Sequence, residues 1–511
     1  MEISFRNREC TVYRAFSRQT GRTQENTECV VPDTEADIEK IAAVQSALFL
    51  KSKDLTGRGV LISGEAAASV LYIREGQEGL SCLRVRQPFS MEFEVENLES
   101  DAMAQVSLLL QGADVRLVNP RKISVTFEIE GTLECFCREK VLTESGLPEE
   151  NPYGLHAKTE TQILTLPNAL GEKSVAVNEQ FGIPAGGPKL SRLVSEQAQL
   201  LIGDCQLIGG RCIVKGNVEI SVCAMAEESG EPVTKEFSVP FSQILDIGAE
   251  SMAFCIVRPE ITGAYFDLID TVNGEKALDL ELHAVLQLVS FGEYSASRIT
   301  DVYSNLMPTE LIMESTGYER LSPPQKRLIS ATESLSLTER CGRLLGVFSS
   351  PSRIAAEQGR LSAAVNLDFL YENADGKLSA GRRMITINEE TDTEGMQLLG
   401  VRTAELNARA EGETVDCGVS LEITCLSGTR EDSSVVTGVA LKAESPYATD
   451  SFPSVTLVRP EGESLWDLAR LYHSSEELIR AVNADAENGQ MLMIPKCLQT
   501  YGRADGAFSK E

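Results

Sequence analysis

A strand pattern that occurs three times constrains the fold of this chain more than any other feature. The copies occupy residues 57–73, 209–225 and 358–373, and in each a Gly-Arg pair near the start is followed by alternating residue types. Period-two alternation with β-branched residues is typical of a strand that buries one face. The copies lie too far apart for the short repeats of a solenoid. The pattern therefore predicts tandem β domains.

Each copy continues into further strand patterns. A turn rich in Gly, Glu and Asp follows the repeated strand, and a second alternating segment follows the turn. Another strand pair is predicted further along each copy, and these pairs lie at 113–136, 262–291 and 402–428. In the second pair, Val-Asn-Gly-Glu at 272–275 has the residues of a type I′ turn. Each copy therefore predicts two hairpins.

Segments with helical periodicity precede the repeated strands. Residues 33–52 begin with a capping residue and place apolar side chains at Ile38, Ile41 and Ala42, which is the spacing of one helix face. Residues 188–203 and 327–346 occupy equivalent positions ahead of the other two copies. We expect a short helix in each.

Together these patterns predict a mainly β, multidomain protein with three tandem β-rich modules that carry short helices. A chain of 511 residues is long enough for such an arrangement. The predicted divisions are an N-terminal segment at 1–30, modules at 31–150, 175–310 and 327–447, and a small unit at 455–497. Predicted linkers lie at 142–154, 307–325 and 444–454, where Pro mixes with polar residues.

Composition limits the kinds of partner. Asp and Glu number 76 against 47 Lys and Arg, which gives a formal charge of −29. Such a field repels nucleic acid and anionic lipid, so a basic protein surface is the better partner. No apolar stretch is long enough for a membrane span, and the first residues lack a signal-peptide pattern. We expect a cytoplasmic protein whose 13 cysteines are reduced and mostly buried.

The end of the chain has a different pattern. Residues 455–460 read as a short strand, and Ser464 with Asp467 three residues later has the spacing of an acidic capping box. The helix that follows would bury one apolar stripe, formed by Leu465, Leu468, Ala469 and Tyr472. Trp466, the only tryptophan, lies beside this stripe. It either packs the start of the helix or anchors a protein partner, and the two roles are compatible.

A second helix and a strand complete this unit. Ser474 and Glu477 repeat the capping spacing. The inner face of the helix would carry Leu478, Ile479 and Val482. Residues 488–496 supply a turn and a closing strand, so the predicted order is strand, helix, helix, strand.

This unit resembles a LysM domain, through "GESLWDLARLY" at 462–472, "EELIRAVN" at 476–483 and "GQMLMIP" at 489–495. The matching positions are Gly462, Trp466, Leu468, Ala469, Leu478, Asn483, Gly489, Gln490, Leu492, Ile494 and Pro495. The resemblance implies a βααβ fold with antiparallel strands. Glu463 stands where Asp is usual, and the segment from 483 to 489 is shorter than the usual loop at the glycan groove.

The combination of tandem β modules and one terminal LysM unit resembles the SPOCS-domain spore coat morphogenesis proteins. That resemblance implies a non-enzymatic adaptor in spore coat assembly, made in the mother cell and located at the forespore surface. Its LysM domain would bind the coat-basement ATPase, stage IV sporulation protein A, and other coat proteins are further candidate partners. The expected partner-binding face comprises Gly462, Glu463, Ser464, Leu465, Trp466, Asn483, Asp485 and Asn488.

The sequence leaves two alternatives to the adaptor. LysM domains commonly bind N-acetylglucosamine polymers, so a peptidoglycan-binding protein is the alternative. A hydrolase is the third hypothesis, but the sequence has no P-loop, GxSxG or HExxH motif. Cys135 with Cys137, and Cys417 with Cys425, lie on predicted strands without a second ligand pair nearby in sequence. We therefore expect no catalytic residues, no metal site and no cofactor.

Overall fold

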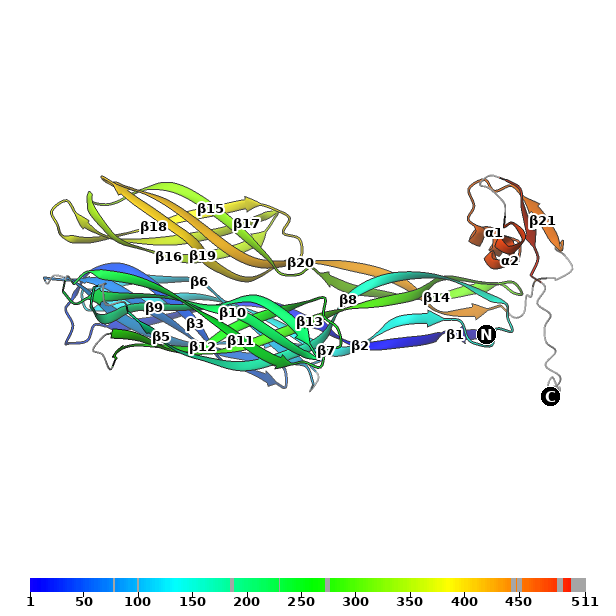
Figure 1. Cartoon of the computed structure of the whole chain (residues 1–511), viewed down its shortest axis with the longest axis horizontal. Helices are drawn as coiled ribbons and strands as arrows, with labels where there is room; N and C mark the ends of the chain where they lie inside the picture. The colour runs from blue at the N-terminus through cyan, green and yellow to red at the C-terminus, as the bar shows by residue number, and fades with distance from the viewer. Residues whose placement is uncertain are drawn as a thin grey trace.

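Strands dominate this protein. The computed structural model describes residues 1–497 except 77–78, 99–100, 184–187, 229, 272–275, 443–446, 448–452 and 485–489. Over these residues the prediction of a mainly β protein is confirmed. The molecule is elongated, with a head of packed sheets, a narrow stalk, and a small helical unit at the far end of the stalk (Figure 1). We call residues 455–497 the terminal unit.

The three repeated segments are the central strands of three separate sheets. They form β4 (Gly59–Arg74), β10 (Arg211–Ala226) and β17 (Arg360–Asn373), so these strand predictions are confirmed. Each is flanked by two antiparallel neighbours. β4 lies between β3 (Ile38–Thr56) and β5 (Leu80–Glu94), and β10 lies between β9 (Leu190–Ile208) and β11 (Pro232–Asp246). β17 lies between β16 (Cys341–Glu357) and β18 (Leu378–Glu390).

A second set of strands lies opposite each of these sheets. Opposite the sheet of β4 lie β2 (Arg6–Val30), β7 (Lys122–Gly146) and β6 (Met103–Asn119). Opposite the sheet of β10 lie β8 (Leu155–Gly182), β13 (Lys276–Ser304) and β12 (Phe254–Asp270). Opposite the sheet of β17 lie β15 (Gln325–Ser336), β20 (Thr414–Leu441) and β19 (Met396–Glu411). Apolar side chains from each pair of facing sheets meet in one core, which makes three sandwiches.

The strand pairs predicted at 113–136, 262–291 and 402–428 are confirmed. They lie in the antiparallel pairs β6–β7, β12–β13 and β19–β20. The predicted turn at 272–275 lies outside the described residues.

The helices predicted at 33–52, 188–203 and 327–346 are wrong. The first two segments belong to β3 and β9, and the third covers β15 and the start of β16. The ladder between β3 and β4 shifts register three times, between Ile38 and Lys40, Ile41 and Ala43, and Leu50 and Ser52. A bulge inserts an extra residue, so it breaks strict alternation and produces apolar spacings of three and four. The ladders of β9 and β16 are interrupted three times as well.

Two segments predicted to lie outside the modules also form strands. The N-terminal segment at 1–30 contains β1 (Glu2–Ser4) and β2, and β2 pairs with β7 along its length. The linker predicted at 307–325 is wrong, because residues in it form β14 (Thr309–Leu321), which pairs with β20. The partner strand lies about a hundred residues away in sequence, so only the folded chain reveals it.

The stalk consists of strands that continue beyond the head. β2 and β7, β8 and β13, and β14 and β20 remain paired past the end of the sandwiches, and β1 pairs with the end of β20 (Figure 1). Where they meet, an apolar cluster forms from Phe5, Leu155, Ile299, Val302, Leu306, Met307, Val436, Val439 and Leu441. This cluster gives the stalk a core of its own.

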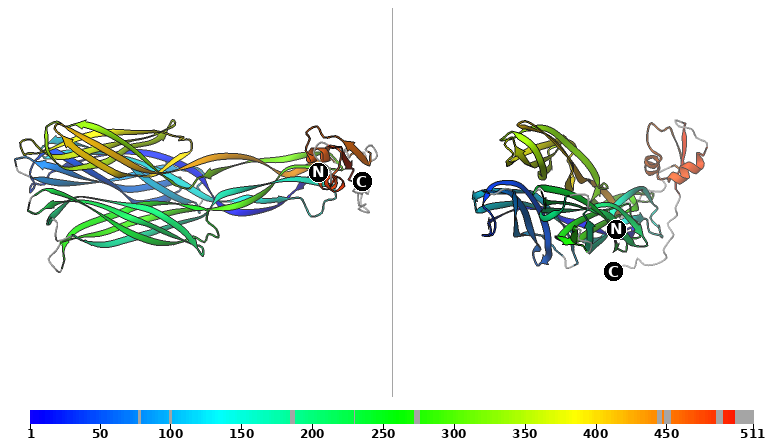
Figure 2. Two further views of the ribbon diagram at one scale, coloured as in Figure 1. Left: turned by 45° about the horizontal axis from the view of Figure 1, so that its top comes forward. Right: turned by 60° about the vertical axis from the view of Figure 1, so that its left-hand side comes forward.

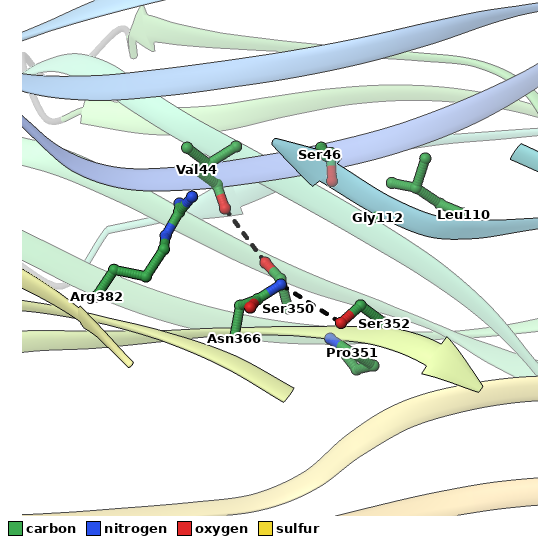
Figure 3. A pocket seen from close by; sticks show the side chains of 10 residues that line it. Val44, Ser46, Leu110, Gly112, Ser350, Pro351, Ser352, Asn366 and Arg382 are labelled. Carbon is green, nitrogen blue, oxygen red and sulfur yellow. Dashed lines mark hydrogen bonds between the residues drawn. The ribbon is translucent and has the colours of Figure 1, made fainter. Parts of the chain in front are cut away.

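The three sandwiches contact one another in the head. One apolar cluster joins all three, with members Ala42, Ala43, Leu71, Ile73, Leu80, Val194, Cys223, Met225, Leu370 and Ala380. Between the first and third sandwiches, Val44 N–H donates to Asp368 Oδ2 at 2.9 Å, and Ser350 Oγ donates to the Val44 carbonyl at 3.2 Å. Figure 3 shows Val44, Ser350 and Arg382 around the cavity at this contact, which has room for no more than a water molecule.

The terminal unit contains both helices of the described chain. β21 (Val455–Val458), α1 (Leu465–Leu471), α2 (Glu476–Val482) and β22 (Leu492–Pro495) follow in that order. β21 and β22 pair antiparallel, with Leu457 opposite Met493. The left view of Figure 2 shows this unit at the end of the stalk, on the opposite end of the molecule from the head.

Candidate partner-binding site

Helix α1 begins where the capping residues predict. Ser464 Oγ accepts a hydrogen bond from Asp467 N–H at 3.2 Å, and Asp467 Oδ2 accepts one from Ser464 N–H at 3.3 Å. This reciprocal pair is the predicted capping box. The hydrogen bonds from Ser464 also lower the pKa of the Asp467 carboxyl. Local sequence therefore fixes the start of α1.

Helix α2 begins one residue later than predicted. Its N-cap is Ser475, whose Oγ accepts a hydrogen bond from Leu478 N–H at 3.2 Å. Ser474, the predicted cap, instead donates through Oγ to the Pro495 carbonyl at 2.5 Å. Ser474 thus ties the connection between the helices to the end of β22. Two adjacent serines have equal capping propensity, so the sequence could not distinguish them.

The two helices and the two strands share a small core. The predicted stripe on α1 is confirmed, since Leu468 and Ala469 are buried and Leu465 and Tyr472 pack against them. Ile479 and Ile494 complete the buried set. The predicted inner face of α2 is only partly correct: Leu478 and Val482 are 36% and 47% exposed.

Trp466 lies against the stalk. Its side chain is 8% exposed, and Nε1–H donates to Asp301 Oδ2 at 2.8 Å. The indole meets the Tyr303 ring edge-on, with 4.8 Å between ring centroids. Asp301 and Tyr303 belong to β13, whose ladder with β8 shifts register between Ile299 and Asp301. Such a bulge changes the direction of the side chains beside it. Trp466 therefore joins the terminal unit to the end of β13.

Further contacts surround Trp466, and we call them together the junction. Tyr303 OH donates to the Ser474 carbonyl at 2.9 Å, and its ring stacks on His156 at 5.1 Å between centroids. Arg470 Nη1 lies 3.2 Å from Asp301 Oδ2. On the other side of the unit, the ring of His473 lies 4.3 Å from the ring of Tyr447. Two histidines and two tyrosines thus flank the attachment.

Burial changes the proton affinities at the junction. It lowers the pKa values of His156 and His473, because the charged imidazolium is poorly solvated there. It also raises the pKa of the Tyr303 hydroxyl, so this group keeps its proton for the hydrogen bond to Ser474. The junction therefore combines aromatic rings with the ion pair of Arg470 and Asp301.

The predicted binding residues at the start of α1 lie in and beside the capping turn. Gly462 has a φ of +122°, and a Cβ there would meet no atom within 4 Å, so the glycine is required by its backbone conformation. Glu463 Oε2 accepts a hydrogen bond from Glu461 N–H at 2.7 Å. Ser464 is the N-cap, and Leu465 is partly buried in the core of the unit.

The predicted residues after α2 are split between described and undescribed parts of the chain. Asn483 donates through Nδ2 to the Ile479 and Met493 carbonyls, at 2.6 and 2.7 Å, and its Oδ1 accepts from Met493 N–H at 2.8 Å. Its amide thus fastens the end of α2 to β22. Asp485 and Asn488 lie outside the described residues.

An exposed apolar surface covers the outer side of the two-stranded sheet. Leu457 and Met493 face each other across the ladder and are 61% and 41% exposed. Val455 and Met491 are exposed as well, two residues from Leu457 and Met493 respectively. We call these four residues the outer face. Sequence reasoning missed it, although alternation with Val458, Leu492 and Ile494, which pack inward, was a usable signal.

Other kinds of site are sparse in the described residues. One group of side chains there could hold a metal ion, formed by Cys205, Cys212 and Cys255 in the second sandwich. No described helix has the length and apolar character needed to cross a membrane.

These observations define an elongated protein of three β-sandwiches with a helical terminal unit. Residues 37–118 match the family model described as SipL, SPOCS domain. The match begins one residue before β3 and ends within β6, so it covers the first three-stranded sheet and the strand that follows it. No curated protein and no solved structure matches the chain.

The match confirms the predicted resemblance to SPOCS-domain proteins over these residues. The chain thus contains a domain of a sporulation family, which indicates a sporulation-related role. The same succession of strands recurs at β9–β12 and β16–β19, where three strands of one sheet are followed by an outer strand of the facing sheet. The LysM resemblance of the terminal unit stays a prediction.

Proposed function

We propose that this chain is a non-enzymatic adaptor in spore coat assembly. In this proposal three SPOCS-like modules, at 31–150, 175–310 and 327–447, form the body, and a LysM domain at 455–497 binds a protein partner. The observation that carries the proposal is the SPOCS match in a chain whose terminal unit is held away from the head by a stalk. Such a shape separates two attachment points within one molecule.

The repetition of modules has structural support beyond the single match. β3, β9 and β16 are each interrupted by three register shifts against the central strand of their sheets. The ladders on the other side of the central strands, β4–β5, β10–β11 and β17–β18, run without a shift. Shared irregularities of this kind are typical of related domains, since bulges are kept within families.

Protein binding by the terminal unit is supported by its outer face. Exposed apolar side chains that gather in one place are typical of interaction surfaces. Val455, Leu457, Met491 and Met493 supply such a surface. Methionine adapts its shape to a partner, and it is enriched at protein interfaces. Because Trp466 and Asn483 are engaged within the chain, the outer face is the better candidate for the contact area.

The partner in this proposal is the coat-basement ATPase, stage IV sporulation protein A, met at the forespore surface in the mother cell. This choice rests on the resemblance to SPOCS-domain spore coat proteins. The formal charge of −29 adds that a basic region on the partner would be favoured, with association that slows as salt increases.

Truncation tests the proposal. A chain ending before Val455 should lose capture of the ATPase in a pull-down, while its circular dichroism keeps the strand signal of the head. Undiminished capture by the truncated chain would contradict the proposal. Sedimentation with purified peptidoglycan forms the second arm. Saturable binding that also depends on residues 455–497 would replace the protein-binding adaptor by the glycan-binding alternative.

A further inference from the structure

Three cysteine thiols from distant parts of the chain come together in the second sandwich. Cys205 lies on β9, Cys212 on β10 and Cys255 on β12. Their three Sγ atoms all lie within 4.8 Å of one another. All three are free thiols. Among the described residues this is the one group of three or more potential metal ligands drawn from His, Cys, Asp and Glu.

The fold accounts for this placement. β9 and β10 form a hairpin through Gly209 and Gly210, which have positive φ values of 56° and 78°. Cys212 pairs with Leu207, two residues from Cys205, so the two cysteines are diagonal neighbours on the same face of the sheet. Cys255 reaches them from the facing sheet. The trio therefore spans the two sheets of one sandwich.

The surroundings suit ligand exchange with solvent. Cys212 is fully buried at 0% exposure, whereas Cys205 and Cys255 are partly exposed. A cation could thus reach the sulfur atoms from the surface and be held against the apolar core beneath. Adjacent in sequence to Cys205, Asp204 adds a carboxylate at the exposed edge of β9. Negative charge near a thiolate site favours a cation.

The spacing suits thiolate coordination. Sulfur ligands at about 2.3 Å in tetrahedral geometry lie roughly 3.8 Å apart, so the trio needs to close by only about 1 Å at most. Three sulfur ligands select thiophilic ions such as Zn²⁺ and Cu⁺ over Mg²⁺ or Ca²⁺, which prefer oxygen. A fourth position on the exposed side would be filled by water, because Asp204, the strand neighbour of Cys205, lies on the opposite face of the sheet.

We propose that Cys205, Cys212 and Cys255 form a three-thiolate site for a thiophilic d¹⁰ cation, with Zn²⁺ as the ion to be tested first. The bound ion clamps the two sheets of the second sandwich to each other. Binding releases the thiol protons and links β12 to the hydrogen-bonded hairpin of β9 and β10 in the facing sheet. The site lies in the head and is independent of the proposed adaptor role of the terminal unit.

The test uses the full chain, reduced and freed of metal. Co²⁺ is titrated first, because thiolate ligands give it intense charge-transfer bands, and Zn²⁺ or Cu⁺ is then added in competition. Bound metal is counted by elemental analysis. The Cys205→Ser/Cys212→Ser/Cys255→Ser variant is compared with the native chain. A matched control carries Cys10→Ser, Cys29→Ser and Cys341→Ser, which replace three partly buried thiols outside this cluster.

We expect the site variant to lose one equivalent of metal per chain and the control to lose none. Zinc should raise the thermal unfolding midpoint of the native chain and of the control, but not of the site variant. If the site variant is unstable, the single variants Cys205→Ser and Cys255→Ser replace it in the test, because both positions are partly exposed. Each single variant should weaken zinc binding by about tenfold or more. Equal metal content in the native chain and the site variant would overturn the proposal, as would absence of binding in the reduced native chain.

Discussion

The head and the terminal unit are held in place by different kinds of contact. In the head, Arg258 on β12 and Glu134 on β7 pair at 2.6 Å, with side-chain exposures of 7% and 4%. Arg258 also donates to Gln105 Oε1 at 2.8 Å, and Arg18 contacts the same glutamate. At the junction, the ion pair between Arg470 and Asp301 is 49% and 24% exposed.

This difference matters because breaking a buried ion pair costs much folding free energy, whereas breaking an exposed pair costs little. The first and second sandwiches are therefore joined by a buried pair whose loss on either side leaves an uncompensated charge. The terminal unit is attached separately, through Trp466 and its neighbours, so we expect its release to leave the head undisturbed. A body with a separately attached terminal unit is compatible with the adaptor role proposed above.

The largest effect is expected from breaking the buried pair in the head. Glu134→Ala leaves Arg258 charged and buried, which should cost about 3–5 kcal/mol of folding free energy. Thermal or urea unfolding followed by far-UV circular dichroism measures this loss. Glu139→Ala on the same strand removes the exposed pair with Arg14 and should cost less than about 1 kcal/mol. Equal effects of the two substitutions would show that burial does not distinguish these pairs.

The second effect separates the two regions. Trp466→Ala removes a buried indole and its hydrogen bond to Asp301, and should weaken the junction by about 3 kcal/mol. Hydrogen exchange in residues 455–497 should rise while exchange in the head stays unchanged. Arg470→Ala, which removes only the exposed ion pair, is the control and should change little. Increased exchange throughout the head would contradict separate attachment.

A third effect concerns the carboxyl group of Glu260, a partly buried residue in the head. Burial raises the pKa of Glu260 from 4.5 to about 8, although Leu108 N–H donates to it at 3.1 Å. A raised pKa means that the folded state holds a proton that the unfolded state releases. The associated stability is present below pH 4.5 and is lost as the pH rises to about 8.

Glu260→Gln should remove this loss, because a neutral amide keeps the acceptor for Leu108. We expect the variant to be more stable than the native chain by on the order of 2 kcal/mol at pH 8 and to differ little at pH 4. Unfolding curves at the two pH values measure the difference. A variant that is less stable at pH 8 would mean that the carboxylate is ionised and satisfied in the folded head.

The smallest effect is a pH response of the junction. The pKa values of His156 and His473 are lowered from 6.5, so below pH 6.5 the unfolded or released state takes up protons that the docked state excludes. The junction should therefore weaken as the pH falls from 6.5. Because Trp466 is the only tryptophan, its fluorescence reports this contact alone. An emission maximum that stays constant between pH 7 and 5 would exclude such a response.

Sequence patterns predicted the start of α1 and its apolar stripe because these signals are local. The capping box of Ser464 and Asp467 and the stripe of Leu468 and Ala469 depend on residues within one or two turns. The attachment of Trp466 could not be predicted, since Asp301 and Tyr303 lie more than 150 residues away and reach it only through the stalk. Aromatic residues suit intrachain and interchain contacts equally, so residue type alone left both roles open.

In the head, the alternating central strands were predictable and the bulged strands were not. Ile38, Ile41 and Ala42 have helical spacing because register shifts interrupt the ladder between β3 and β4. The cysteine trio illustrates the same limit. Cys205 and Cys212 are close in sequence, but Cys255 joins them only because the two sheets of the sandwich face each other. The bulged strands and the cysteine trio both depend on pairing between distant segments, which a local sequence pattern does not predict.

In the proposed function, the outer face of the terminal unit binds a partner while Trp466 holds the unit to the stalk. The most direct measurement is the dissociation constant of the full chain for stage IV sporulation protein A, determined by interferometry for the native chain, Trp466→Phe and Leu457→Asp/Met493→Asp. We predict a loss of about 100-fold or more for the double variant, since it places charge in an apolar contact, and a change of less than about tenfold for Trp466→Phe. Unchanged affinity of the double variant together with a large loss for Trp466→Phe would contradict the account.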